Sequence, residues 1–139
     1  MSNEKCILLV EDNPDHAALA LRALRRAEVD NEVVVMEDGE HALSFLDARA
    51  QRDLPTVVLL DLNLPGISGH EVLRHIRQTA QLQTLPVVIL STSDEEQDKV
   101  LSYQLGANSY MLKPVEFDDF VCMASCFSQY WLKFNQQCH

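Results

Sequence analysis

The sequence predicts an α/β fold, a doubly wound parallel sheet of five strands with five helices. Five short apolar segments recur at intervals of 22 to 30 residues, and each interval leaves room for a helix. The clearest segments lack polar alternation, which is typical of strands covered on both faces. Residues that start and stop helices lie between the segments. Together these observations favour a repeating βα pattern.

The expected strands, in chain order, are residues 6–10, 33–36, 57–60, 87–90 and 109–112. The first helix is expected to begin at Asn13 and Pro14, because proline is tolerated in the first turn of a helix. The alanines and leucines that follow, through Ala27, favour its continuation.

The later helices carry signals at their ends. Ser68 with Glu71, and Ser93 with Glu96, each match the capping box, in which a hydroxyl and a carboxylate bond to free amides at a helix start. Gly106 is placed to end the helix that follows Ser93, because glycine readily adopts the left-handed conformation found after a helix end. The fifth helix is expected to run from about residue 116 towards residue 135.

Length and charge narrow the class of protein. The chain has 139 residues, which suits one domain. Eleven Lys and Arg face 21 Asp and Glu, and the formal charge of -10 disfavours nucleic acid or anionic lipid as a partner. No apolar run approaches the roughly 20 residues that cross a bilayer, and the N-terminus lacks the pattern of a signal peptide. We therefore expect a cytoplasmic protein without membrane contact.

Polar residues follow the expected strands at their carboxyl ends, where doubly wound sheets bind ligands. They are Glu11 and Asp12, Asp61, Ser91 and Lys113. Three carboxylates in one cleft repel each other, so we expect a hard divalent cation, Mg²⁺, between them. An aspartate can also attack phosphorus and form an aspartyl phosphate. An amine and a hydroxyl would then face the phosphate oxygens.

Four motifs resemble the receiver domains of two-component response regulators. They are LLVEDN at 8–13, LLDLNLPGISG at 59–69, PVVILSTS at 86–93 and GANSYMLKPV at 106–115. The resemblance covers a core of about residues 5–127, with an extended C-terminal helix to about 135, in a single receiver domain of 1–139. It implies a flavodoxin-like or CheY-like fold with strand order 2-1-3-4-5.

The resemblance also implies roles for the residues at the strand ends. Asp61 is expected to be the phosphoacceptor, and Lys113 is expected to contact the phosphoryl group. The expected ligands of Mg²⁺, or of Mn²⁺ in its place, are Glu11, Asp12, Asp61 and the backbone carbonyl of Asn63.

The same resemblance implies switch and rate-modulating residues and one cis peptide bond. Ser91 is the expected switch hydroxyl, and Tyr110 is the aromatic residue expected to turn inward after phosphorylation. Asn63 and Ser93 fall at the two positions expected to modulate autodephosphorylation. The bond between Lys113 and Pro114 is expected to be cis.

A receiver of this kind accepts a phosphoryl group from a sensor histidine kinase and signals through protein contacts. It is an enzyme only towards itself, in phosphotransfer and autodephosphorylation. The ending QYWLKFN, with NSYMLKPV before it, resembles the stand-alone receivers paired with phytochrome-type kinases. The resemblance puts the kinase contacts around Asp15, Ala18, Leu19, Arg22 and Val115.

Two other functions are compatible with the same residues. A phosphatase of the haloacid dehalogenase type also uses an aspartate nucleophile and Mg²⁺, but it requires a second aspartate where this chain has Asn63. A receiver-like module that binds proteins without phosphorylation is the other alternative. Each motif alone could also be a simple helix cap or turn. The five histidines are expected to be exposed residues rather than ligands.

The fifth helix carries more apolar surface than docking on one sheet face uses. One stripe is expected to pack on the sheet and comprises Phe117, Phe120, Val121, Ala124, Phe127 and Trp131. A second stripe beside it favours a homodimer or partner surface through the fourth and fifth helices. A tail that folds back over its own domain is the alternative. The expected interface residues are Met123, Cys126, Phe127, Tyr130 and Phe134.

Overall fold

A computed structural model of the chain describes residues 6–134, with the side chains of its last helical segment through Leu132. The strands are β1 (Ile7–Val10), β2 (Val33–Met36), β3 (Val57–Leu60), β4 (Val87–Ser91) and β5 (Ser109–Leu112). The helices are α1 (Pro14–Arg26), α2 (Gly39–Asp47), α3 (Gly69–Gln78), α4 (Glu96–Gln104) and α5 (Phe117–Phe127). Short 3₁₀ turns lie at Gln51–Asp53 and Ala80–Leu82, and a π-helix at Ser128–Phe134 follows α5.

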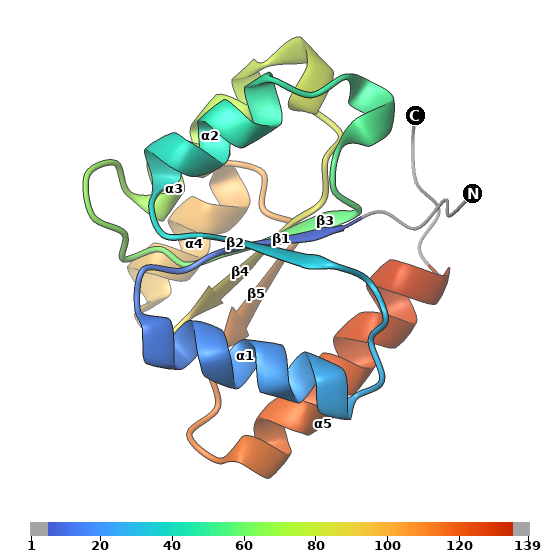
Figure 1. The fold of residues 1–139 in the computed structure, drawn as a ribbon. Helices are drawn as coiled ribbons and strands as arrows, with labels where there is room; N and C mark the ends of the chain where they lie inside the picture. Colours follow the sequence, from blue (N-terminus) through green and yellow to red (C-terminus); the bar gives the residue numbers. More distant parts are fainter. Residues whose placement is uncertain (1–5, 135–139) are drawn as a thin grey trace.

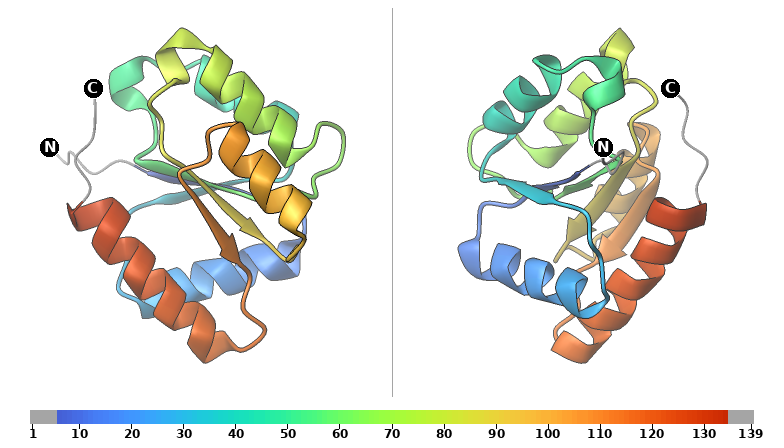
Figure 2. Two further views of the ribbon diagram at one scale, coloured as in Figure 1. Left: turned by 180° about the vertical axis from the view of Figure 1, so that it is seen from behind. Right: turned by 45° about the vertical axis from the view of Figure 1, so that its right-hand side comes forward.

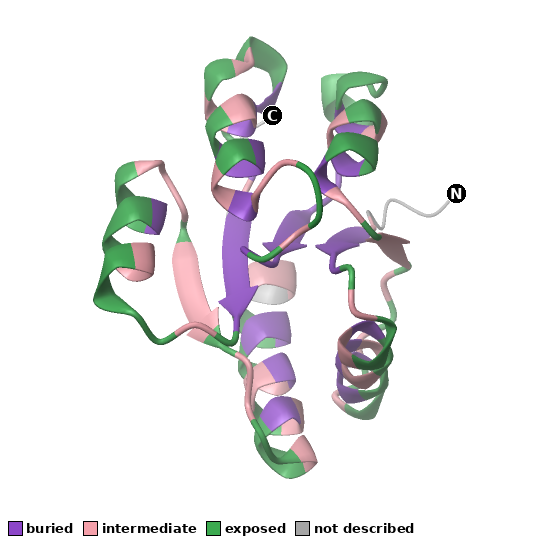
Figure 3. Ribbon diagram, turned by 90° about the vertical axis from the view of Figure 1, so that its left-hand side faces the viewer, coloured by how far each residue is buried: buried purple, intermediate pink, exposed green. Residues whose placement is uncertain are grey.

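The five strands form one parallel sheet in the order β2-β1-β3-β4-β5 (Figure 1). The predicted fold class and strand order are therefore confirmed. The three central strands are buried along their whole length, whereas β2 and the first three residues of β5, at the sheet edges, are only half-buried (Figure 3). This difference follows from position, because an edge strand has a neighbour on one side only.

Helices cover both faces of the sheet. Helices α2, α3 and α4 lie on one face, and α1 and α5 lie on the other (Figures 1 and 2). Alternate strand residues point to opposite faces, so Leu8 and Val10 pack with α2 and α3, while Ile7 and Leu9 pack with α1 and α5. The strands thus need apolar residues at every position.

Most of the predicted helix ends are confirmed. The Asn13 side chain accepts hydrogen bonds from two backbone amides of the first turn of α1. Ser68 and Glu71 form both hydrogen bonds of the capping box at α3. Gly106 has a φ of +101°, and the chain leaves α4 there. Glycine reaches this conformation without the strain that a Cβ would cause.

The predicted capping box at Ser93 and Glu96 is wrong. Helix α4 begins only after Glu95, two residues beyond Ser93, and no side chain caps it. The Ser93 hydroxyl instead accepts from the backbone amide of Glu95 at 3.3 Å and donates to the Asp98 carboxylate at 2.5 Å. Ser93 therefore stabilises the turn before the helix rather than the helix end.

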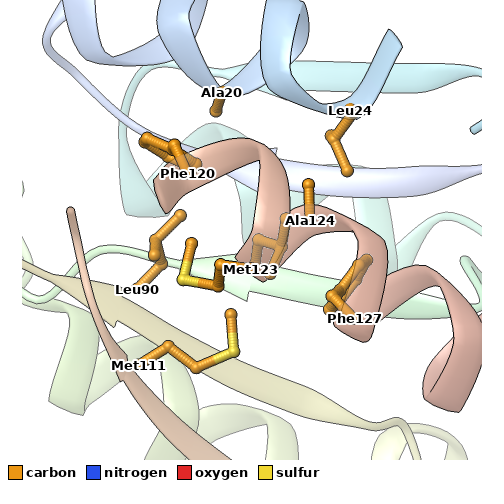
Figure 4. A pocket seen from close by; sticks show the side chains of 9 residues that line it. Ala20, Leu24, Leu90, Met111, Phe120, Met123, Ala124 and Phe127 are labelled. Atoms are coloured by element: carbon orange, nitrogen blue, oxygen red, sulfur yellow. The ribbon is translucent and has the colours of Figure 1, made fainter. Parts of the chain in front are cut away.

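The fifth helical segment reaches the predicted length within the described residues, but it changes to a π-helix after Phe127. The apolar side chains of α5 point toward the sheet and α1 (Figure 4). Phe127 is only 4% exposed and belongs to the core, so its assignment to an interface is wrong. Met123 is half-buried and lines a small apolar pocket with Met111 and Leu90.

Two of the expected interface residues remain exposed on this segment. Cys126 and Tyr130 face the solvent, and Tyr130 is 54% exposed. The side chain of Phe134 lies outside the described residues. Among residues 6–134, no helix has the length and apolar character needed to cross a membrane.

Candidate functional site

The carboxyl ends of the strands gather the predicted polar residues at one edge of the sheet. Backbone hydrogen bonds of the parallel sheet fix their positions. The Asp61 amide donates to the Val10 carbonyl at 3.1 Å, and the Lys113 amide donates to the Ser91 carbonyl at 2.9 Å. Residues at the ends of neighbouring strands are thereby held side by side.

The N-terminus of α3 packs tightly against this edge. The Gly69 amide donates to the Leu62 carbonyl at 3.0 Å. A Cβ atom at position 69 would lie only 2.3 Å from the Asp61 carbonyl oxygen. Any larger residue would therefore push α3 away from Asp61, which explains the glycine that closes the motif at 59–69.

Three carboxylates form a cluster at the site. One oxygen from each of Glu11, Asp12 and Asp61 lies within 4.8 Å of the other two. Glu11 and Asp61 are buried, and Asp12 is exposed. The Asn63 amide donates to Asp61 Oδ1 at 3.4 Å, so the loop after β3 folds back toward the cluster. An all-oxygen acidic pocket of this kind fits a hard divalent cation.

Among the described residues, one buried cation contacts two of the three carboxylates. The side chain of Lys113 is 7% exposed, and its Nζ donates to Glu11 Oε1 and, at 3.3 Å, to Asp61 Oδ2. Burial raises the pKa of the Glu11 carboxyl above its usual value, while the hydrogen bond from Lys113 opposes this shift. The neighbouring Asp61 carboxylate adds to the rise of the Glu11 pKa.

The predicted switch residues meet in the loop between β4 and α4. Ser91 is fully buried, and its Oγ accepts from the Ser93 amide at 3.1 Å. The Tyr110 hydroxyl donates to the Ser93 carbonyl at 2.9 Å, and the ring is half-buried. The same loop residue therefore connects the hydroxyl at the pocket with the aromatic side chain on β5.

The expectation of a cis peptide bond before Pro114 is wrong. Residues 6–134 contain no cis peptide bond, so the bond between Lys113 and Pro114 is trans. The trans form is the intrinsically favoured one for a bond before proline, by about 0.5–1 kcal/mol.

One residue at the site was not predicted. His16, expected to be an exposed histidine, lies in the first turn of α1 with its Nδ1 3.1 Å from Lys113 Nζ. Its side chain is 42% exposed. A helix that starts at Pro14 brings its first turn beside the acidic pair at residues 11 and 12, but this start does not indicate a contact with Lys113.

Comparisons with known proteins agree with this geometry. The family profile of the response regulator receiver domain matches residues 7–125. The probable methanogenesis regulatory protein FilR2 of Methanothrix harundinacea is 41% identical over 132 residues, which cover 94% of this chain and 85% of that protein. Response regulator Rcp1 of Synechocystis is 37% identical over 132 residues, covering 93% and 90%.

Solved structures give the same result. The Mn²⁺-bound form of Rcp1 aligns with a TM-score of 0.85 at 36% identity, covering 97% of this chain and 99% of that chain. The phosphorylated cyanobacterial phytochrome response regulator RcpA aligns with a TM-score of 0.89 at 35% identity, covering 98% and 99%.

The chain belongs to the response regulator receiver domain family. Within that family it is close in sequence and structure to response regulator Rcp1, and close in structure to the cyanobacterial phytochrome response regulator RcpA. This membership removes the support for a phosphatase of the haloacid dehalogenase type.

Proposed function

We propose that Asp61 of this response regulator accepts a phosphoryl group from the phosphohistidine of a sensor histidine kinase. One observation carries the proposal. The Asp61 carboxylate is buried in a pocket with two further carboxylates and with the ammonium group of Lys113, whose Nζ lies 3.3 Å from Asp61 Oδ2. A nucleophile, a cation site and a fixed positive charge are the groups that phosphoryl transfer requires.

In the proposed reaction a carboxylate oxygen of Asp61 bonds to phosphorus as the bond from phosphorus to the histidine nitrogen breaks. The electron pair of that bond stays on the imidazole, which takes up a proton. Lys113 offsets the charge on the transferred oxygens, and the Ser91 hydroxyl donates to one of them. Hydrolysis of the acyl phosphate by water releases inorganic phosphate and returns the free carboxylate.

Glu11, Asp12 and Asp61 would hold Mg²⁺, or Mn²⁺ in its place, together with the backbone carbonyl of Asn63. When bound, the cation offsets negative charge on the phosphoryl oxygens. The Mn²⁺-bound form of the related Rcp1 supports a divalent cation in this family.

The proposed output begins at Ser91. Its hydroxyl would turn toward the phosphoryl group, and Tyr110 would move inward and give up its bond to the Ser93 carbonyl. Ser93 is half-buried and Asn63 is exposed beside Asp61, and we assign both a role in setting the rate of dephosphorylation.

The proposed phosphodonor is a kinase of the phytochrome type, which the likeness to RcpA supports. Val115 lies in the loop after β5 and is 94% exposed, so it is available for such a contact. We further propose a homodimer through α4 and α5, because Leu101 and Tyr103 on α4 and Tyr130 in the π-helix that follows α5 expose apolar surface.

Incubation with acetyl phosphate and Mg²⁺, followed by intact-mass measurement, tests the phosphoacceptor role. The wild-type protein is expected to gain one phosphoryl group. Asp61→Asn should gain none, whereas the matched control Asp53→Asn, an exposed residue in the turn at Gln51–Asp53, should behave as the wild type. A folded wild-type protein that stays unmodified would support a binding module instead. Turnover of many phosphate esters would support a hydrolase.

A further inference from the structure

The ring of His16 contacts the buried ammonium group of Lys113 in the pocket. We propose that His16 is a positioning residue for Lys113. The His16 ring accepts a hydrogen bond from one N–H of the Lys113 ammonium group and holds Nζ at the wall of the pocket nearest α1. This inference rests on the proposed phosphoacceptor function. It adds a residue that the motifs of the strand ends do not include.

Counting donors fixes the state of the ring. A lysine ammonium group has three N–H donors and no lone pair. Lys113 Nζ has three acceptors within reach, namely Glu11 Oε1, Asp61 Oδ2 at 3.3 Å and His16 Nδ1 at 3.1 Å. Because the ammonium group can only donate, Nδ1 of His16 must lack a proton. The imidazole is then neutral and carries its proton on Nε2.

This assignment decides between two interpretations of the same ring. His16 Nδ1 also lies 4.0 Å from Glu11 Oε1, which would be an ion pair only if Nδ1 carried a proton. A hydrogen bond donated by Lys113 to Nδ1, the shorter of the two contacts, is incompatible with that proton. The Lys113 contact is therefore the interaction that orients the ring.

The backbone of α1 holds His16 in place. The His16 amide donates to Asn13 Oδ1 at 3.2 Å, within the cap that starts the helix. The cap follows the acidic pair directly, so the first turn of α1 forms one wall of the pocket. The ring is 42% exposed and Lys113 is 7% exposed, which places His16 on the outer side of the lysine.

A neutral third acceptor has a specific consequence for the proposed reaction. The two carboxylates that bind Nζ are the groups proposed to bind the cation and to accept the phosphoryl group. Their hydrogen bonds with Lys113 must therefore change when the site is used. His16 has neither of those tasks, so it can retain Nζ throughout. Because the ring carries no charge, the full positive charge of Lys113 and two of its N–H groups remain for the phosphoryl oxygens.

The first arm of the test measures the rate of phosphorylation by acetyl phosphate with saturating Mg²⁺. His16→Leu removes the acceptor at similar volume and should slow phosphorylation about tenfold, the factor that loss of one hydrogen bond typically gives. His16→Asn should restore the rate to within about threefold of the wild type, because its amide oxygen can accept from the lysine. His75→Leu on α3 is the matched control and should leave the rate unchanged.

The second arm is independent of phosphorylation. In ¹⁵N NMR spectra of the metal-free protein at neutral pH, His16 should show the tautomer with the proton on Nε2. The Lys113 ammonium resonance should shift in His16→Leu and stay unchanged in His75→Leu. A role of His16 in stability alone would not produce this pattern.

Two results would overturn the inference: a proton on Nδ1 of His16 in the wild type, or an unchanged phosphorylation rate in His16→Leu. If His16→Leu fails to fold, the wild-type tautomer and the rate of His16→Asn decide. A wild-type protein that takes no phosphoryl group would refute the proposed function. The NMR arm would still report whether His16 holds Lys113.

Discussion

Negative charges outnumber positive charges at the acidic pocket, and a single substitution should reduce this excess. Asp12 shares the pocket with two other carboxylates whose oxygens lie within 4.8 Å, and the described residues supply one buried ammonium group there. We expect Asp12→Asn to raise the free energy of unfolding in EDTA by about 1 kcal/mol, the size of one repulsion at this range in high dielectric. The stabilisation that added Mg²⁺ gives the wild type should disappear.

Thermal unfolding in EDTA and in Mg²⁺ measures both effects. Asp15→Asn is the matched control, because Asp15 lies in the first turn of α1 but outside the cluster. That variant should be slightly less stable, by roughly 0.3–1 kcal/mol, since a negative charge favours a helix N-terminus. Loss of stability in Asp12→Asn in EDTA would contradict the assigned repulsion.

An ion pair at the start of α2, between the N-cap Asp38 and His41, gives a pH-dependent prediction. The hydrogen bond and charge of Asp38 raise the pKa of His41, and hydrogen bonds from the His41 amide and ring lower the pKa of Asp38. The stabilisation that His41 contributes to the fold is present below the ordinary pKa of its ring. It is lost as pH rises through the raised pKa of the folded protein. The contribution from Asp38 is present above its ordinary pKa and is lost as pH falls through the lowered value. The pair therefore stabilises the fold between about pH 4 and pH 6.5.

NMR titration of the His41 ring tests this coupling. Asp38→Asn should lower the His41 pKa towards its ordinary value while leaving an oxygen that can cap α2. Asp47→Asn, which alters a carboxylate bonded to His75, should leave the His41 titration unchanged. An unaltered His41 midpoint in Asp38→Asn would show that the pair does not form in solution.

The residues at the strand ends could be predicted because parallel strands present their carboxyl ends at a common edge. The structure brings Glu11, Asp12, Asp61 and Lys113 together there. The contact of His16 was missed because it joins residues 97 apart in the chain, and its exact position depends on how α1 packs. A hydrophobic pattern contains no such information.

Among the helices, α1 ends in a motif that its sequence does not favour. The amides of Glu28 and Val29 donate to the carbonyls of Arg25 and Leu24, which is the Schellman pattern. Glu28 adopts a φ of +64° there, although it carries a Cβ. Helix α4 uses Gly106 at the equivalent position.

Replacing the strained residue should stabilise the protein. We expect Glu28→Gly to raise the free energy of unfolding by about 1 kcal/mol, because glycine removes the left-handed penalty. Denaturant unfolding measures the change. Glu28→Ala removes the charge but keeps the Cβ, so it should give no such gain. Equal stabilisation by alanine would attribute the effect to charge instead.

Element positions could be predicted where one physical signal dominates. The strands follow from continuous apolar runs, and the sequence matches β2, β3 and β5 to the residue. The start of α4 could not be predicted in this way. Ser93 and Glu96 satisfy the capping pattern, but a competing bond from Ser93 to Asp98 uses the hydroxyl in the preceding turn. The sequence pattern alone does not show whether the Ser93 hydroxyl caps the helix or bonds to Asp98.

The whole molecule presents its unused apolar surface around one edge of the sheet. Strand β5 forms this edge and lies between α4 and α5 (Figure 2, left). Val100, Leu101 and Tyr103 on α4 are exposed, and so is Leu112 on β5. Because Phe127 is buried, it is no longer part of the expected interface. The centre of that interface therefore shifts from α5 toward α4 and β5.

The homodimer proposed above therefore predicts a particular double variant. Leu101→Lys with Tyr130→Ser should convert the wild-type dimer to a monomer in sedimentation velocity, because it places charge and polar groups on both flanks of β5. Val115→Ser is the control, since Val115 is 94% exposed but lies in the loop after β5. It should leave the sedimentation coefficient unchanged. A monomeric wild type, with and without acetyl phosphate, or a double variant that stays dimeric would refute this interface. In the first case the exposed surface of α4 and β5 would have to serve a different protein partner, and in the second the subunits would have to associate through another face.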